Sequence, residues 1–490
     1  MGNIRKFISG VISSYIYIIV TSLIALWLTP YTLSFMDKTH YGYYILIADI
    51  LAWINLLQFG VSGVFNSKAA MCIGKADYVQ LQKYTNTAQL MQSMSAVMIL
   101  IIGVFTSFFI DAVFDTAGIL KIDVILTFII AAVTSAISVI KQPLSAILVA
   151  NKQVHIDNFL NLFLYLIQVL LVVLFLNLGF SIISLSISHL IATILITLIT
   201  YYRVKKLPFK LDLGIKKYDK TIFGEFLSTG LWFTIGSIGQ IFIYKIDRFF
   251  IGSSISLDEV TSFYITTKLY DFSNVFFANF VNISRPYFSQ LYVQHNMEKL
   301  RKLYDILLNG SILLLVLICS VIFLCDEWFI KIWIKNEVDV YLGDKVSLLF
   351  AVSIILQSAI LPNRVLLAST LYKVRFHGLT RVAEGCLKFL LSIFLVDVYG
   401  IQGLLISSII SCVLCSTIFM NYLSNKVLMR SFKHQIFNYL SYLSMIILLL
   451  MYIITDKRIA LVVLVLVYVI IFVALRKFAF SLNNKGIFNN

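Results

Sequence analysis

The chain has 490 residues, of which 60% are hydrophobic and 13% are charged, and its net charge is +15. Soluble globular domains average about 25% charged residues, so this composition excludes that class and indicates a polytopic membrane protein. The six cysteines lie mostly in or beside apolar runs, and the closely spaced Cys412 and Cys415 have no histidine or acidic residue nearby. This placement favours buried thiols over a disulfide framework or a metal site.

Apolar runs long enough to cross a bilayer recur along the whole chain. A hydrocarbon core of about 30 Å needs about 20 residues of helix. The run from 7 to 28 lacks a small-residue cleavage site, so we interpret it as a retained first span rather than a signal peptide. We predict an all-α polytopic membrane protein with about 14 transmembrane helices. The predicted spans are 8–29, 41–63, 90–110, 122–140, 156–176, 180–202, 226–251, 261–283, 304–325, 345–366, 379–396, 401–423, 435–455 and 459–475.

Lysine and arginine are concentrated in every second connecting segment, beginning with the N-terminal one, and the acidic residues lean toward the opposite side. Cytoplasmic segments of membrane proteins carry such a basic excess, so we expect both termini in the cytoplasm. The basic charge then reports topology and contact with anionic lipid. We therefore expect no nucleic-acid partner.

A basic segment, Tyr202 to Glu225, separates the first six predicted spans from the next six. Similar residues recur at a shared offset of about 220, for example Tyr84 and Tyr304. Parallel repeats with substrate held between them are a common transporter plan. We predict two six-helix lobes in pseudo-twofold repeat around a central lumen, followed by a C-terminal helical hairpin. The predicted divisions are an N-lobe at 1–205, a basic cytoplasmic linker at 206–225, a C-lobe at 226–425, and the last two spans with a short cytoplasmic tail at 426–490.

The stretch from Gln240 to Gln290 carries ionisable residues at depths where lipid tolerates few. A charge at the centre of the bilayer costs about 2.5 to 3.5 kcal/mol on insertion scales, so such residues usually face protein or a water-filled cavity. The second predicted helix of this stretch places its polar residues close to one stripe. The two helices carry Lys245, Asp247 and Arg248, then Lys268, Asp271, Asn274, Asn282 and Arg285.

Polar stripes at helical spacing also occur in the first half, and they have two interpretations. Asn55, Gln58, Ser62 and Asn66 fall on one predicted helical face. They either join helices through hydrogen bonds worth about 0.6 kcal/mol each or line an aqueous lumen, and matching stripes in both halves favour the lumen. Asp49 stands alone in its span, where a packed, hydrogen-bonded carboxylate is favoured over a proton relay.

A ladder of ionisable residues near the cytoplasmic end of the eleventh span includes Arg381, Glu384 and Lys388, and Lys141 lies at the same depth in the fourth span. Arg381 and Glu384 can pair within one helix. The basic surplus at this rim would attract phosphate, so we predict an anionic ligand that approaches from the cytoplasm. No phosphate-binding loop and no HExxH motif occurs, so we expect neither an ATP-driven pump nor an enzyme, and no cofactor.

Four segments carry a resemblance to a known family: Leu28 to Ala70, Lys245 to Asp271, RPYFSQL at Arg285 to Leu291, and YGIQGLLISSIIS at Tyr399 to Ser411. With these segments the chain resembles the polysaccharide transporters, the bacterial O-antigen and capsule repeat-unit flippases, of the multidrug/oligosaccharidyl-lipid/polysaccharide superfamily. The resemblance implies a V-shaped bundle of two lobes in the bacterial cytoplasmic (inner) membrane. It also implies flipping of undecaprenyl-diphosphate-linked repeat units by alternating access through a cationic lumen.

The resemblance and the depth of the polar residues together suggest roles. The expected contacts to diphosphate or acidic sugar are Lys245, Arg248, Lys268, Arg285, Lys141, Arg381 and Lys388. The expected contacts to sugar hydroxyls are Asn55, Gln58, Asn274 and Asn282, and the coupling or structural acids are Asp49, Asp247, Asp271 and Glu384. The further partners that we expect are membrane lipids, H+ or Na+ as coupling ions, and polysaccharide polymerase and chain-length proteins. Two alternatives stay open: a cation-coupled multidrug exporter of the same superfamily, and a membrane polysaccharide polymerase or glycosyltransferase.

Overall fold

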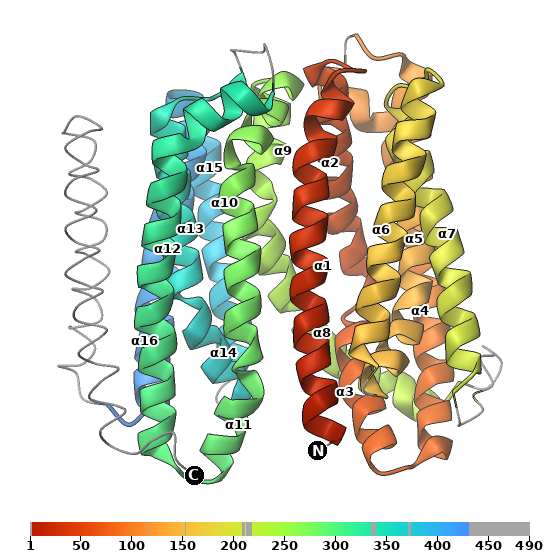
Figure 1. Cartoon of the computed structure of the whole chain (residues 1–490), viewed down its shortest axis with the longest axis vertical. Helices are drawn as coiled ribbons and strands as arrows, with labels where there is room; N and C mark the ends of the chain where they lie inside the picture. The colour runs from red at the N-terminus through yellow and green to blue at the C-terminus, as the bar shows by residue number, and fades with distance from the viewer. Residues whose placement is uncertain are drawn as a thin grey trace. The chain divides into compact units, whose positions relative to one another are not determined.

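The computed structural model describes residues 2–116, 118–151, 153–207, 211, 218–334, 340–370 and 374–430. All regular elements in these residues are helices, which confirms the predicted all-α class (Figure 1). The predicted spans at 435–455 and 459–475 lie outside the described residues.

The helices follow one another with short connections. The first part of the chain forms α1 (Gly2–Leu33), α2 (Lys38–Ile54), η1 (Asn55–Gln58), α3 (Val61–Gly74), α4 (Tyr78–Phe109), η2 (Ile110–Ala112), α5 (Lys121–Ala150), α6 (Val154–Asn177) and α7 (Ile183–Lys205). The remainder forms α8 (Lys220–Tyr244), α9 (Ile246–Ser254), α10 (Leu257–Ile283), α11 (Arg285–Val293), α12 (Met297–Trp333), α13 (Asp344–Ala359), α14 (Leu361–Ser369), α15 (Val374–Ser411), η5 (Cys412–Thr417) and α16 (Ile418–Val427).

Aspartates begin several helices by accepting from backbone amides that have no partner within the helix. Asp37 accepts from the His40 amide at 2.9 Å at the start of α2, and Asp77 accepts from the Gln80 amide at 2.9 Å at the start of α4. Asp219 accepts from the Thr221 amide at 2.9 Å at the start of α8. Local sequence therefore determines where these helices begin.

Within the described residues, nine helices are long and apolar enough to cross a membrane, or ten if α2 and α3 form one bent span. This is the architecture of a multi-pass membrane protein. The predicted spans 379–396 and 401–423 fall in one helical stretch of 50 residues, Gly378–Val427. It kinks at Gly400, whose φ of 56° and ψ of −135° are outside the helical range. The charged α10, predicted as a span, is outside the nine.

Two helix breaks alter the predicted polar stripes. Phe59 and Gly60 have φ values of 47° and 64°, and α2 and α3 meet there at a bend of 57°. Left-handed residues cannot continue a right-handed helix, so Asn55 and Asn66 do not share one continuous helical face as predicted. In the later stretch α10 ends at Ile283 and Arg285 begins α11, so a helix break separates Asn282 from Arg285 in the predicted stripe.

The helices pack into two compact units. Unit 1 comprises Met1–Ile265, Trp333–Tyr341 and Lys373–Ser416, and unit 2 comprises the described parts of Thr266–Ile332, Leu342–Tyr372 and Thr417–Asn490. The core of unit 1 includes the fully buried Phe65, Leu81 and Phe226, so α8 shares a core with α3 and α4. The predicted lobes at 1–205 and 226–425 remain a prediction.

Small residues allow α8 and α15 to approach closely within unit 1. A Cβ atom on Gly239 would lie 2.4 Å from the Arg381 carbonyl carbon, and one on Gly385 would lie 2.7 Å from the Phe242 Cβ. Glycine at a helix crossing lets two backbones meet, as is common in membrane proteins. The close approach brings the buried Lys388 of α15 to Asp247 of α9 and to the end of α8.

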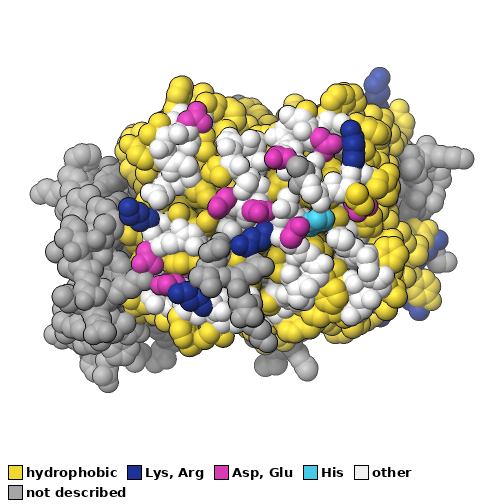
Figure 2. All heavy atoms as spheres, turned by 90° about the horizontal axis from the view of Figure 1, so that it is seen from above, with side chains coloured by type: hydrophobic (Ala, Val, Ile, Leu, Met, Phe, Trp, Pro, Cys, Tyr) yellow, Lys and Arg dark blue, Asp and Glu magenta, His cyan; other side chains and the backbone are white. Residues whose placement is uncertain are grey.

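Figure 2 shows one end of the molecule, where the side chains of the end face differ in chemical type from those around the edge of that face. Aspartate and glutamate side chains are spread over this end face, whereas hydrophobic side chains surround it. Apolar flanks beside a polar end face suit helices that cross a lipid bilayer.

Candidate functional site

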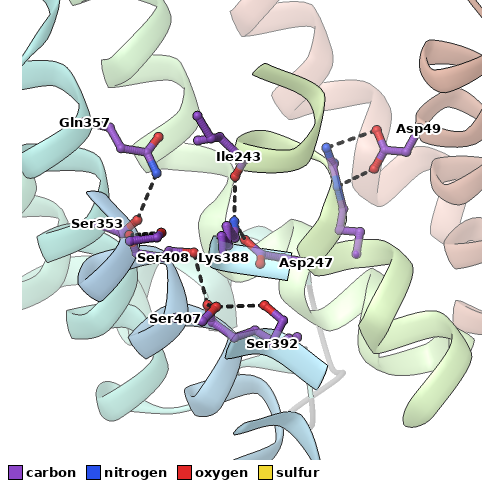
Figure 3. A network of polar contacts seen from close by, with 12 residues as sticks. Asp49, Ile243, Asp247, Ser353, Gln357, Lys388, Ser392, Ser407 and Ser408 are labelled. Atoms are coloured by element: carbon purple, nitrogen blue, oxygen red, sulfur yellow. Dashed lines mark hydrogen bonds and ion pairs between the residues drawn. The ribbon is translucent and has the colours of Figure 1, made fainter. Parts of the chain in front are cut away.

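A three-residue ion cluster joins α2 to the start of α9 in unit 1, and we call it the cationic cluster: Asp49, Lys245 and Arg248. Lys245 Nζ lies 2.7 Å from Asp49 Oδ1. Arg248 Nε lies 2.7 Å from Asp49 Oδ2, and Arg248 Nη2 donates to Asp49 Oδ1 at 3.3 Å. Figure 3 shows Asp49 with the two contacts to the guanidinium. Two nitrogens of the Arg248 guanidinium thus contact the Asp49 carboxylate, and this two-point contact fixes the orientation of the carboxylate.

The break between α8 and α9 determines this geometry. Because α8 ends at Tyr244 and α9 begins at Ile246, Lys245 lies at the break and Arg248 lies in the first turn of α9. Residues three apart at such a turn lie on one side, so both bases reach the same carboxylate. Asp49, which stands alone in its own span, has its ionic partners in a distant part of the chain.

The cationic cluster contains two bases and one acid, so its formal charge is +1. Its exposure is graded: the Asp49 side chain is 3% exposed, Arg248 is 16% exposed and Lys245 is 35% exposed. The Asp49 carboxylate is therefore buried among protein atoms, while the Arg248 and Lys245 side chains are partly exposed at the surface of unit 1. An arrangement of this kind offers ammonium and guanidinium groups to an anion.

Lys388 of α15 forms a second, neutral pair. Its Nζ lies 2.8 Å from Asp247 Oδ2 and donates to the Ile243 carbonyl at 2.5 Å (Figure 3). The Lys388 and Asp247 side chains are 1% and 11% exposed. Ile243 is in the last turn of α8, where carbonyls lose their intrahelical partners. The Lys388 ammonium therefore donates to a carbonyl at the helix break and also balances the charge of the Asp247 carboxylate.

Other predicted site residues on α15 and α5 have separate polar contacts. Arg381 Nη1 donates to Gln240 Oε1 at 3.0 Å, and the buried Glu384 accepts from the Ser416 hydroxyl. Lys141 Nζ donates to Asn161 Oδ1 at 3.2 Å. These contacts attach the basic residues to neighbouring helices within unit 1.

Asn55 and Gln58 belong to a polar network rather than to a regular stripe. Asn55 Oδ1 accepts from the Ser135 hydroxyl at 2.8 Å and from Gln58 Nε2 at 3.4 Å. Asn55 also borders a cavity of about 240 Å³ whose lining includes Tyr44, Ser135 and His189. Hydroxyl, amide and imidazole groups around such a space can bind water or hydroxyl groups of a ligand.

The remaining predicted residues belong to unit 2. The largely buried Lys268 places its Nζ 5.3 Å from the centre of the Phe272 ring. Asn274 Oδ1 accepts from the Ser358 hydroxyl at 2.9 Å, and Asn282 Nδ2 donates to the Ala278 carbonyl at 2.8 Å. Asp271 is half-buried, and Arg285 is exposed at the start of α11.

A contact between the first half of the chain and α8 was not predicted from the sequence. Lys68 pairs with Glu225, which also accepts from the Tyr84 hydroxyl at 3.0 Å, and Lys68 lies 5.5 Å from the centre of the Tyr84 ring. A Cβ on Gly230 would lie 2.1 Å from the Phe59 carbonyl oxygen in the same region. Helical periodicity carries no information between helices, so the sequence pattern gave no signal for this pairing with Glu225.

Solved structures with the same fold are transporters. The chain resembles an inward-facing multidrug resistance MATE family transporter of the MOP superfamily, with a TM-score of 0.66 and 14% identity over 83% of this chain and 95% of that one. An outward-facing MATE transporter of this superfamily matches with a TM-score of 0.63 and 14% identity over 86% and 95% of the chains. The chain therefore shares its fold with these transporters.

A third structure is a MOP superfamily transporter from Pyrococcus furiosus Vc1, described as having a binding pocket of reverse polarity that suggests a different function. It matches with a TM-score of 0.63 and 14% identity over 86% of this chain and 96% of that one. A comparison with curated proteins finds no match. The family model described as "Polysaccharide biosynthesis protein" matches residues 34–342. The chain belongs to this polysaccharide biosynthesis family.

Proposed function

We propose that the protein is a flippase that moves an undecaprenyl-diphosphate-linked oligosaccharide, an O-antigen or capsule precursor, from the cytoplasmic to the outer leaflet by alternating access. The observation that carries the proposal is the cationic cluster, in which one buried carboxylate is paired with two bases. Membership of a polysaccharide biosynthesis family supports a glycan as the cargo. The MOP transporter fold supports translocation as the activity.

Physical chemistry makes a polar path necessary for this cargo. Moving sugar hydroxyls and a diphosphate through hydrocarbon without compensating contacts costs several kcal/mol for each polar group. Lys245 and Arg248 would bind the diphosphate, and the amide and hydroxyl groups around Asn55 would bind sugar hydroxyls. The prenyl chain would stay in the hydrocarbon of the bilayer, so its movement between the leaflets would carry no desolvation cost.

Reconstitution into liposomes tests the proposal. The substrate is a fluorescent undecaprenyl-diphosphate oligosaccharide, and the readout is the fraction that becomes accessible to a membrane-impermeant quencher in the opposite leaflet. The control is the same oligosaccharide on an uncharged glycerolipid. We expect protein-dependent translocation of the diphosphate lipid and much slower translocation of the neutral one. Equal rates for both lipids, or no translocation of either, would contradict the proposal.

A cation-coupled multidrug exporter is the second candidate, because the MATE structures share the fold. Such an exporter would offer carboxylates to a cationic drug, whereas Asp49 and Asp247 are both paired with bases. Proton- or sodium-driven efflux of a cationic dye from the same liposomes, without glycolipid translocation, would favour this candidate.

The proposal extends to the placement of the protein in the cell. Both termini would lie in the cytoplasm of a bacterium and the helices in its cytoplasmic membrane, as the basic connecting segments indicate. An H+ or Na+ gradient would drive transport. Polysaccharide polymerase and chain-length proteins would use the translocated repeat units.

A further inference from the structure

A groove on the surface of unit 1 lies apart from the cationic cluster. It has a volume of about 650 Å³ and is formed by α1, α6 and α7 near the ends where α1 and α6 begin and α7 ends. Its lining includes Ile16, His155, Phe159, Phe163, Ile199 and Arg203. We call it the α1/α6/α7 groove.

The walls of the α1/α6/α7 groove are apolar and open to the surroundings. Ile16 is 49% exposed, Phe159 is 68% exposed and Phe163 is 43% exposed. The two phenylalanines begin an exposed apolar stripe along α6 that continues with Leu170 and Leu174. Because α6 is long and apolar enough to span a membrane, this stripe faces lipid chains. A hydrocarbon chain is therefore the ligand group that fits against these apolar walls.

One end of the groove is polar and basic. Arg203 lies in the last turn of α7 and is exposed, and His155 lies in the first turn of α6. The Nδ1 atom of His155 is buried and has no hydrogen-bond partner within the described part of the chain. Such buried polar atoms usually have a partner, so a ligand atom at this position would satisfy it.

Aromatic and basic residues beside Arg203 indicate the depth of this end. Lys205 Nζ lies 4.7 Å from the centre of the Tyr201 ring, and Lys206 Nζ lies 4.5 Å from the centre of the Tyr202 ring. Tyrosines and snorkelling lysines gather at the interface between hydrocarbon and head groups. Arg203 is therefore at the height of lipid phosphates, while Phe159 and Phe163 lie deeper.

We propose that the α1/α6/α7 groove binds one anionic phospholipid. Its phosphate contacts the Arg203 guanidinium and the His155 imidazole, and one acyl chain lies against Ile16, Phe159 and Phe163. Basic pockets between transmembrane helices are known to select anionic head groups. The apolar walls and the basic end together match a phospholipid, whereas a soluble phosphate would leave the walls without an occupant. This inference does not depend on the proposed transport activity.

Tryptophan quenching by brominated lipid tests the proposal on the intact protein. Phe163→Trp places a reporter in the groove, and subtraction of the wild-type signal removes the five native tryptophans. The protein is reconstituted in bilayers with brominated phosphatidylglycerol or brominated phosphatidylcholine. We expect the reporter to show an apparent affinity about fivefold higher for phosphatidylglycerol, the effect of one basic side chain at the interface.

Variants at the end of α7 distinguish a specific lipid site from a general attraction of anionic lipid to basic side chains. Arg203→Gln in the Phe163→Trp background removes the preference, and Arg203→Lys retains most of it. Lys205→Gln is the matched control, because Lys205 is exposed on the same turn but does not line the groove. Equal loss in the Arg203→Gln and Lys205→Gln proteins would overturn the proposal. Displacement by soluble glycerol phosphate at equal efficiency would also overturn it, because the apolar walls would then contribute nothing.

Discussion

Replacement of Lys388 by methionine should destabilise the protein more than replacement of both members of its ion pair. The Lys388 ammonium is 1% exposed and contacts Asp247 Oδ2 at 2.8 Å and the Ile243 carbonyl at 2.5 Å. Lys388→Met keeps a long apolar stem in the same space and removes the charge. The Asp247 carboxylate, with 11% of its side chain exposed, then lacks this basic partner.

The magnitude follows from the burial of both groups. Breaking a buried ion pair by removing one partner costs about 3 to 5 kcal/mol, because the other charge stays desolvated. Asp247→Asn should cost a similar amount for the same reason. In the double variant both charges are gone, and the main loss is the hydrogen bond to the Ile243 carbonyl, which costs about 1 to 3 kcal/mol. The double variant should therefore be more stable than either single variant.

The assay is the free energy of unfolding of the purified proteins, from reversible titration with denaturing detergent in mixed micelles. Ser392→Ala is the matched control on α15, since it removes a neutral hydrogen bond of 2.8 Å to the buried Ser407 hydroxyl. It should cost about 1 kcal/mol. If the double variant lost the sum of the two single losses, Lys388 and Asp247 would be energetically independent and the argument would be wrong.

Further predictions concern the contact between α8 and the first half of unit 1. Gly230→Ala should lower the melting temperature, because its Cβ would lie 2.1 Å from the Phe59 carbonyl oxygen, and Gly224→Ala, with open space at its Cβ, should not. Lys68→Glu should destabilise through repulsion with Glu225, and the added Glu225→Lys should restore part of the loss in the same thermal assay; no restoration would refute the pair. Hydrogen bonds from the Thr221 hydroxyl and the first-turn amides lower the pKa of Asp219. The ionised Asp219 carboxylate therefore stabilises the folded protein above its unfolded-state pKa. This stabilisation disappears as the pH falls through the lower folded-state pKa. The stability gap between wild type and Asp219→Ala, measured from pH 7 to pH 3, should therefore close at the acidic end.

The helices could be predicted from the sequence because their signals are local. Asp37 precedes α2 and Asp219 precedes α8, and each accepts from an amide in the first helical turn. The length of the apolar runs then predicts the spans, since bilayer thickness sets the number of residues required. The break at Phe59 was missed because a phenylalanine rarely adopts φ of 47°, and only the adjacent Gly60 hinted at it.

The cationic cluster shows what sequence patterns leave open. Depth and spacing marked Asp49, Lys245 and Arg248 individually as costly residues in a membrane. Their pairing could not be predicted, because Arg248 is 199 residues away from Asp49 and helical periodicity carries no information between helices. The same holds for Lys388, which was expected to contact substrate and which the structure joins to Asp247 and to the end of α8.

Translocation of the diphosphate-linked glycan by a variant without the basic groups tests the central claim most directly. Asp49→Asn/Lys245→Gln/Arg248→Gln keeps polar side chains at all three positions and leaves no charge of the cationic cluster unpaired. The control is Lys205→Gln/Lys206→Gln, which removes two exposed charges at the end of α7. We expect liposomes with the first variant to lose flipping at unchanged protein content and melting profile, while the control flips like wild type. Wild-type flipping by the first variant would contradict a cationic path for the diphosphate.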